Sequence, residues 1–147
     1  MQRIYVDTSV IGGYFDPEFE IATRRLFEMF RRAEATMVIS DLTLRELGPA
    51  PEAVRVLVDE YPRETIKASP ASQELADRYI ASGAVAETSR ADAEHIAIAT
   101  IAGVDVLVSW NFRHIVNLPR IRRYNAVNLA SGYPQIDIRT PIEVTGP

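Results

Sequence analysis

Three acidic residues lie far apart in the chain, each at a point where a parallel sheet would gather the carboxyl ends of its strands. Asp7 follows the run Ile4-Tyr5-Val6, Glu46 lies within the segment 41–46, and Asp92 opens the segment 92–97. Two carboxylates about 4 Å apart repel each other by about 4 kcal/mol at an effective dielectric of about 20. A divalent metal ion relieves that repulsion, and it can activate water against a phosphodiester. The three acids therefore predict a metal-binding pocket, provided that the fold brings them together.

Each acid also has a simpler interpretation as part of a helix cap. Asp7 precedes two hydroxyl residues, which is typical of a helix start. Glu46 follows Thr43 by three residues and Asp92 follows Ser89 by three, so both match the capping-box pattern. Independent caps have no reason to occur only in segments that approach one edge of a sheet. The joint pattern therefore favours a shared site.

The elements that must position these acids alternate along the chain. Apolar residues at helical spacing predict helices, and short apolar runs with β-branched residues predict strands. The expected helices cover residues 18–33, 41–47, 51–61, 70–82 and 89–102, and the expected strands cover residues 4–6, 36–39, 65–67, 106–108 and 126–129. Such alternation is typical of βαβ units, in which helices cover both faces of a parallel sheet. We therefore predict an α/β fold with three layers, α/β/α.

The expected topology brings four segments to one edge of the sheet. In open parallel sheets, ligands bind outside the carboxyl ends of the strands. Asp7 lies at that end of the first strand, and Asn111 follows the strand at 106–108. Glu46 lies about one turn into the helix after the second strand, and Asp92 begins a helix that leads toward the fourth. We expect the four side chains to converge there.

Size and composition set bounds on the class of protein. A chain of 147 residues suggests one domain, with a core over residues 1 to about 130 and an extended tail at 131–147, where turn residues are frequent. No apolar stretch approaches the length of a membrane span, and the absence of cysteine fits a reducing cytoplasm. The formal net charge of −4 argues against a protein that coats nucleic acid non-specifically, but it allows a local basic rim.

The order of these motifs resembles that of the PIN-domain nucleases, especially the small stand-alone toxins of the VapC type. The residues that carry the resemblance lie in segments 6–9, 44–46, 91–97 and 107–115, and the resemblance spans residues 1 to about 130. It implies a five-stranded parallel sheet between helices and an endoribonuclease that depends on Mg²⁺ or Mn²⁺. It also implies an RNA substrate, a small antitoxin partner from the same operon, and a homodimer.

The resemblance assigns roles to individual residues. Asp7, Glu46 and Asp92 match the family's metal-binding acids and are expected to be both the catalytic residues and the metal ligands. The family's fourth acid falls at Asn111, whose amide can offer a carbonyl oxygen but no negative charge. The site would then hold at most three formal negative charges instead of four.

Other residues near these acids are expected to contact the substrate. Thr8 and Ser9 could hydrogen-bond the neighbouring carboxylate or touch the phosphate, and Arg113 and His114 follow Asn111 onto the same rim. We also expect the side chain of Asn111 itself to make a polar contact with the RNA.

Two further aromatic residues allow two interpretations each. His95 lies one helical turn after Asp92 and could contact a phosphate, but a buried or capping role is the expected one. Trp110 either stacks on an RNA base or packs in the core, and core packing is the expected role.

The leading prediction is a metal-dependent endoribonuclease, the toxin of a type II toxin–antitoxin pair, located in the cytoplasm. The missing fourth acid allows a second class, a PIN-like module that binds RNA or protein without cleavage. A solitary RNA-processing nuclease is a third possibility if no antitoxin exists. A receiver-like phosphoacceptor domain fits less well, because Lys67 is the only lysine and precedes the late strands.

Overall fold

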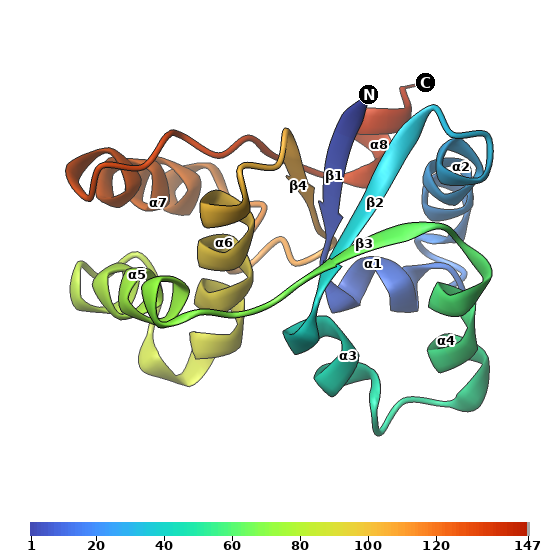
Figure 1. Cartoon of the computed structure of the whole chain (residues 1–147), viewed down its shortest axis with the longest axis horizontal. Helices are drawn as coiled ribbons and strands as arrows, with labels where there is room; N and C mark the ends of the chain where they lie inside the picture. The colour runs from blue at the N-terminus through green and yellow to red at the C-terminus, as the bar shows by residue number, and fades with distance from the viewer. Residues whose placement is uncertain (147) are drawn as a thin grey trace.

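The computed structural model describes residues 1–146. They form three layers, in which one parallel sheet lies between two layers of helices (Figure 1). The five strands are β1 (Gln2–Val6), β2 (Ala35–Ser40), β3 (Arg63–Ile66), β4 (Val106–Val108) and β5 (Ile138–Arg139). They lie in the order β3-β2-β1-β4-β5, and every neighbouring pair is parallel. The predicted three-layer fold with a five-stranded parallel sheet is confirmed.

Helices cover both faces of the sheet, because successive strand residues point to opposite faces and most of them are apolar. One layer contains α1 (Thr8–Gly13), α2 (Glu20–Arg31), α4 (Glu52–Leu57) and α8 (Pro141–Thr145), which share a core with Ile4 and Val6 of β1. The other contains α5 (Pro70–Ala81), α6 (Arg90–Ala102) and α7 (Leu118–Ala130), which pack on Tyr5. Helix α3 (Asp41–Leu47) directly follows β2, and 3₁₀ turns cover Val58–Glu60 and Glu87–Ser89.

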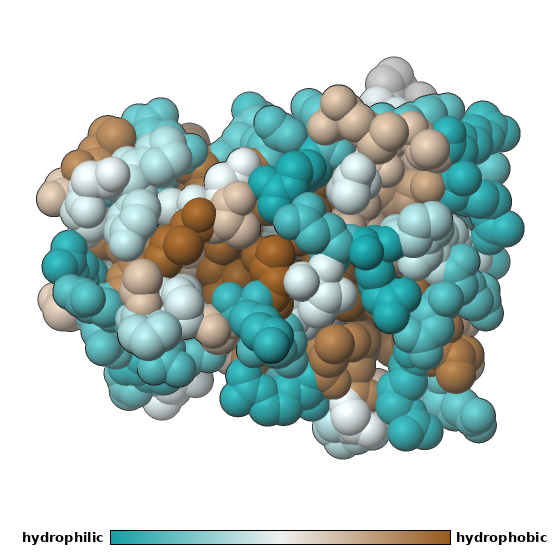
Figure 2. Space-filling model, viewed as in Figure 1, coloured by the Kyte–Doolittle hydropathy of each residue, from teal (hydrophilic) through white to brown (hydrophobic). Residues whose placement is uncertain are grey.

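Helix α6 lies between the sheet and the two helices α5 and α7, so its side chains make up much of the core of that layer (Figure 1). Every residue from His95 to Thr100 is buried. Figure 2 shows hydrophobic residues gathered over this part of the molecule, between outer surfaces that are mostly hydrophilic. Among residues 1–146, no helix has both the length and the apolar character that crossing a membrane requires.

Most of the predicted elements are confirmed within a few residues, but the strand expected at 126–129 is wrong. These residues belong to α7, which begins after Asn117, a cap residue whose side chain accepts a hydrogen bond from the backbone of Arg120. The buried residues of α7 are Tyr124 and Asn128, four positions apart, which is the spacing of one helical face. A short apolar run cannot be assigned to strand or helix from periodicity alone.

The expectation of an extended tail at 131–147 is also wrong over much of its length. Ile138 pairs with Leu107, so the tail supplies the fifth strand of the sheet. Thr140 then caps α8 in a capping box with Glu143, and α8 lies alongside α2. A threonine followed three residues later by glutamate is the sequence signal for this helix start. Residue 147 lies outside the described residues.

An ion pair links the two strands on either side of β2. The guanidinium of Arg3 donates two hydrogen bonds to Glu64, at 2.9 and 2.7 Å, and a third to the carbonyl oxygen of Ala102 at 3.0 Å. The hydrogen bonds from Arg3 lower the pKa of Glu64 from its ordinary value of 4.5. Both side chains remain partly exposed, so solvent screening keeps the contribution small.

We expect Glu64→Gln to lower the free energy of unfolding at pH 7 by about 0.2–1 kcal/mol. Because the folded-state pKa of Glu64 is lowered, the stabilisation is present above 4.5 and is lost as the pH falls through the lowered value. Urea unfolding at a series of pH values should show the parent and the variant converging in acid. As a control, Glu34→Gln changes an exposed glutamate outside the ion pairs of residues 1–146, and a pH-dependent difference there would contradict the assignment.

Candidate active site

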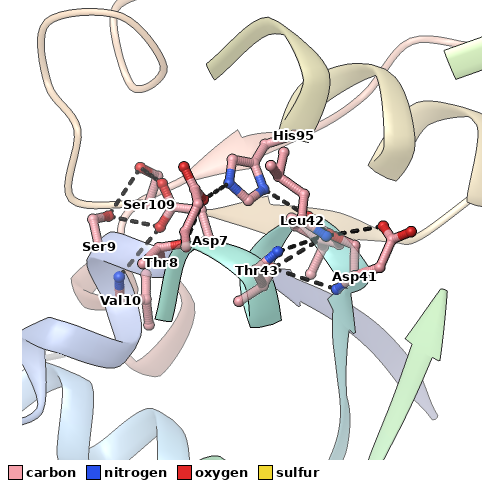
Figure 3. A network of polar contacts seen from close by, with 12 residues as sticks. Asp7, Thr8, Ser9, Val10, Asp41, Leu42, Thr43, His95 and Ser109 are labelled. Carbon is pink, nitrogen blue, oxygen red and sulfur yellow. Dashed lines mark hydrogen bonds and ion pairs between the residues drawn. The ribbon is translucent and has the colours of Figure 1, made fainter. Parts of the chain in front are cut away.

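Asp7 lies at the carboxyl end of β1, where it is 4 % exposed and acts as the N-cap of α1. Its Oδ1 accepts hydrogen bonds from the hydroxyl of Ser9 at 2.6 Å and from the backbone of Val10 at 3.2 Å (Figure 3). Its Oδ2 accepts a hydrogen bond from the hydroxyl of Ser109, at 2.6 Å, in the segment that follows β4. Asp7 therefore caps a helix, as the simpler interpretation required, but it does so as a nearly buried carboxylate.

Burial raises the pKa of Asp7, and the charge of His95 and the hydrogen bonds from Ser109 and Ser9 oppose that rise. A carboxylate in this position is costly to ionise unless positive charge lies near it. The local structure thus holds an acidic group where a cation would stabilise it.

Glu46 is the second acid, and it does not cap α3. Ser40 is the N-cap of that helix, and it forms the capping box with Thr43. Glu46 Oε1 instead accepts a hydrogen bond from the hydroxyl of Thr8 at 2.6 Å and lies 2.6 Å from Nε2 of His95. The capping-box interpretation of Glu46 is therefore wrong.

The pKa of Glu46 reflects two opposed effects. Its burial raises the pKa, while the hydrogen bonds and charge around it, chiefly from His95 and then from Thr8, lower the pKa below its ordinary value overall. These effects favour the ionised form of Glu46. Its Oε1 is held by hydrogen bonds with Thr8 of α1 and His95 of α6.

Asp92 is the third acid and lies in the first turn of α6, where it is partly buried. Ser89, which precedes that helix, makes no side-chain cap hydrogen bond, so the capping-box interpretation of Asp92 is also wrong. Burial raises the pKa of Asp92, and the neighbouring charge of His114 opposes that rise. The charges of Asp7 and Glu46 raise the pKa further.

The three acids therefore interact electrostatically, although they come from β1, α3 and α6. Carboxylates are the oxygen ligands that Mg²⁺ and Mn²⁺ prefer, so the donor chemistry fits a hard divalent ion. Among residues 1–146, however, no group of three or more Asp, Glu, His or Cys side chains is arranged to hold a metal ion as it lies. Binding of one ion by all three acids would require their side chains to move closer together.

Asn111, at the position of the family's fourth acid, is engaged in a local turn. Its Oδ1 accepts hydrogen bonds from the backbone of Arg113 at 3.2 Å and of His114 at 2.9 Å. Its own backbone N–H donates to the hydroxyl of Ser109 at 2.9 Å, the same hydroxyl that donates to Asp7. Asn111 thus shapes the loop beside the acids, and its amide oxygen already has partners.

Two predicted substrate contacts follow on this loop. Arg113 is exposed and takes part in none of the ion pairs between residues 1–146. His114 is close enough to Asp92 to lower its pKa, and its Nδ1 is buried without a hydrogen-bond partner in the described part of the chain. His114 therefore lies close to Asp92, and Arg113 lies exposed on the same loop.

Two further residues complete the network, and the sequence had singled out only one of them, His95. Ser109 is fully buried and donates to Asp7, and its position directly after β4, next to β1, was the available signal. His95 is 2 % exposed and contacts Glu46, and its signal was the spacing of three residues from Asp92. Trp110 is 6 % exposed, which agrees with the expected core packing.

Trp110 fixes the segment that follows β4. Its ring stacks on Phe19, with 4.4 Å between the ring centroids. Its indole nitrogen donates a hydrogen bond to the hydroxyl of Thr23 at 2.9 Å. The backbone N–H of Trp110 donates a hydrogen bond to the hydroxyl of Ser9 at 3.0 Å. The same hydroxyl donates to Asp7, so Trp110 is linked to the acidic site through Ser9.

Comparison with known proteins gives a likeness at the level of structure. No family model matches the sequence, and no match was found among curated protein sequences. The chain is similar to the crystal structure of VapBC2 from Rickettsia felis bound to a DNA fragment from their promoter, with a TM-score of 0.59 and 16% identity over 95% of this chain and 98% of that chain. It is also similar to Mycobacterium tuberculosis VapC20, described as a sarcin-ricin loop cleaving toxin, with a TM-score of 0.57 and 15% identity over 91% of this chain and 98% of that chain. The topology and these similarities together show that the chain has the PIN-domain fold of the VapC type.

Proposed function

We propose that this chain is a divalent-metal-dependent endoribonuclease and the toxin of a toxin–antitoxin pair. The observation that carries the proposal is the electrostatic coupling of Asp7, Glu46 and Asp92 at the carboxyl edge of a PIN-type sheet. A fold does not by itself determine an activity, so the proposal depends on this site.

Asp7, Glu46 and Asp92 would hold Mg²⁺ or Mn²⁺, which would neutralise charge at the phosphate and lower the pKa of a bound water. The hydroxyls of Ser9 and Ser109 fix Asp7 by hydrogen bonds to both of its oxygens. No hydrogen bond within residues 1–146 reaches Oε2 of Glu46, so this oxygen is available to accept a proton from the attacking water.

The surrounding residues divide into supports and substrate contacts. The hydroxyl of Thr8 is bonded to Glu46 and that of Ser9 to Asp7, so their proposed role is to hold these carboxylates. Arg113 carries an exposed guanidinium beside the site, and we assign it a contact with an RNA phosphate. His114 is assigned the same role, and Asn111 holds the turn that carries both.

The proposed partners are an RNA substrate, a cognate antitoxin and a second copy of the chain, in the cytoplasm. The similarity to a VapBC2 complex supports a protein partner. The product of the gene adjacent to this one, co-expressed with the chain, should copurify with it and suppress its activity. A chain that has no such neighbour but cleaves RNA would be a solitary processing nuclease.

A metal titration tests the proposed activity. The purified chain is incubated with an RNA ladder in EDTA and then in increasing Mg²⁺ or Mn²⁺ at constant ionic strength. We expect cleavage products only in the presence of the divalent ion and their loss when EDTA is added again. Persistent cleavage in EDTA would contradict a metal-dependent mechanism.

One observation favours a second function, a module that binds RNA without cleavage. The described residues contain no ready metal-binding group, and the amide oxygen of Asn111 is committed to its own turn. The same titration separates the two functions: RNA binding that persists in EDTA, without cleavage at any Mg²⁺ or Mn²⁺ concentration, would select the binding module.

A further inference from the structure

His95 is a buried histidine that uses both ring nitrogens. Its Nε2 lies 2.6 Å from Oε1 of Glu46, and its Nδ1 lies 2.7 Å from the hydroxyl of Tyr5. The rings of His95 and Tyr5 also meet edge to face, with centroids 5.7 Å apart. Figure 3 shows the imidazole reaching from α6 into the polar network that contains Asp7 and Thr43. His95 therefore connects the central strand to the helix that carries Glu46.

The partners of His95 define which nitrogen carries the proton. An ionised carboxylate only accepts hydrogen bonds, so Nε2–H donates to Glu46. When the ring carries only this proton, Nδ1 is an acceptor, and the phenol of Tyr5 donates to it. Burial raises the pKa of Tyr5, which keeps the phenol protonated for this purpose.

The chain of hydrogen bonds continues beyond Tyr5. Because the phenol of Tyr5 donates its own hydrogen to His95, its oxygen accepts a hydrogen bond from the hydroxyl of Ser40, at 2.7 Å. Ser40 is itself fixed by the capping box at the start of α3, the helix that carries Glu46. The network thus closes a loop from α3 through β1 and α6 back to α3.

This loop leaves Glu46 anchored on one side only. Both hydrogen bonds to its carboxylate, from Thr8 and His95, end on Oε1. Among residues 1–146, none ends on Oε2, so the fixed oxygen determines where the free one points. Most side-chain hydrogen bonds in proteins go to backbone groups or water, whereas both ring nitrogens of His95 contact side chains.

We propose that His95 is the positioning residue of Glu46 and that Tyr5 fixes His95 for this task, an inference that rests on the proposed nuclease function. By holding Oε1, the pair restricts the directions in which Oε2 of Glu46 can point. Groups that orient a metal-binding or catalytic carboxylate typically contribute about 10–100-fold to metal affinity or activity.

The test compares His95→Leu, His95→Gln and Tyr5→Phe with the parent, in the full chain. Leucine fills similar space without a donor, whereas the glutamine amide can still donate to Glu46. We expect His95→Leu to lower kcat of Mn²⁺-dependent RNA cleavage by about 10–100-fold and to leave KM for RNA unchanged. His95→Gln should restore most of the rate, and Tyr5→Phe should fall between the parent and His95→Leu.

A matched control separates positioning from a general effect on the core. Tyr79 is another fully buried tyrosine, and its hydroxyl donates to Asn128, in a network between α5 and α7. Tyr79→Phe should cost stability in urea unfolding but leave kcat at the parent value. Equal losses of kcat in Tyr79→Phe and Tyr5→Phe would overturn the positioning role.

Mn²⁺ binding, followed by the spectrum of the free ion in electron paramagnetic resonance, gives a readout independent of cleavage. We expect weaker binding in His95→Leu and Tyr5→Phe and the largest loss in Asp7→Asn. Loss in Asp7→Asn with parent-like binding and kcat in both other variants would overturn the inference and leave the proposed function standing. Parent-like binding and cleavage in Asp7→Asn as well would overturn the proposed function itself.

Discussion

Asp7→Asn should lose metal-dependent RNA cleavage by about 100-fold or more and, in EDTA, should unfold at higher denaturant concentration than the parent. Loss of a metal-binding carboxylate removes several kcal/mol of charge stabilisation at the reacting phosphate, and each 1.36 kcal/mol corresponds to about tenfold in rate. The comparison is made with the same RNA and saturating Mn²⁺ for both proteins.

The expected gain in stability follows from the surroundings of Asp7. Its carboxylate is 4 % exposed, and burial raises its pKa, so its charge is unfavourable without a cation. An asparagine keeps an acceptor for the hydroxyl of Ser9 and can donate to the oxygen of Ser109. Removing a destabilising active-site charge commonly stabilises a protein by about 0.5–2 kcal/mol.

A matched control for this variant is Asp105→Asn. Asp105 lies just before β4, at the opposite edge of the sheet, where its Oδ2 accepts a hydrogen bond from the backbone of Arg3 at 2.7 Å. An asparagine can accept the same bond, so cleavage should stay at the parent rate. Full activity in a folded Asp7→Asn protein would show that Asp7 is not a catalytic residue.

Gly13→Ala should lower the free energy of unfolding by about 1–3 kcal/mol, the usual cost of forcing an extra methyl group into a packed site. A Cβ at Gly13 would lie 2.7 Å from the indole nitrogen of Trp110, 2.8 Å from its neighbouring ring carbon and 3.0 Å from the hydroxyl of Thr23. It would therefore meet both partners of the Trp110–Thr23 hydrogen bond. The two indole atoms belong to a buried, stacked ring, so they cannot move aside at low cost.

Gly12→Ala provides the matched control within the same helix. A Cβ there would meet no atom within 4 Å, and alanine is favoured over glycine inside a helix by about 0.5–1 kcal/mol. Urea unfolding should thus shift in opposite directions for the two variants. Trp110 is the only tryptophan, so its fluorescence should change in Gly13→Ala and not in Gly12→Ala. Equal stability in the two variants would mean that α1 is not clamped against Trp110.

The positions of the acids along the chain could be predicted from local patterns. A short apolar run that contains β-branched residues ends just before Asp7, and the helical spacing around Asp92 places it near a helix start. These patterns depend on backbone periodicity and capping, which act over a few residues. They predicted the central strands, the alternation with helices and the parallel sheet, all of which the structure contains.

The errors arose where a segment's structure depends on distant partners. Residues 126–129 suggested a strand, but Tyr124 and Asn128 are buried on one face of α7. Ile138 becomes a strand residue because β4 offers an unpaired edge, and α8 forms where α2 offers a surface. Short segments have weak intrinsic preferences, so tertiary contacts decide their conformation.

The same distinction holds at the site. The sequence by itself determined the types of residue available, three carboxylates and one amide in segments that end at the carboxyl edge of a parallel sheet. Only the tertiary structure decided that Glu46 bonds to Thr8 and His95 instead of capping its helix, and that the oxygen of Asn111 is used by its own loop. Hydrogen bonds between side chains 38 and 49 positions apart exist only once packing has brought α1, α3 and α6 together, because no local pattern records which partners the folded chain will supply.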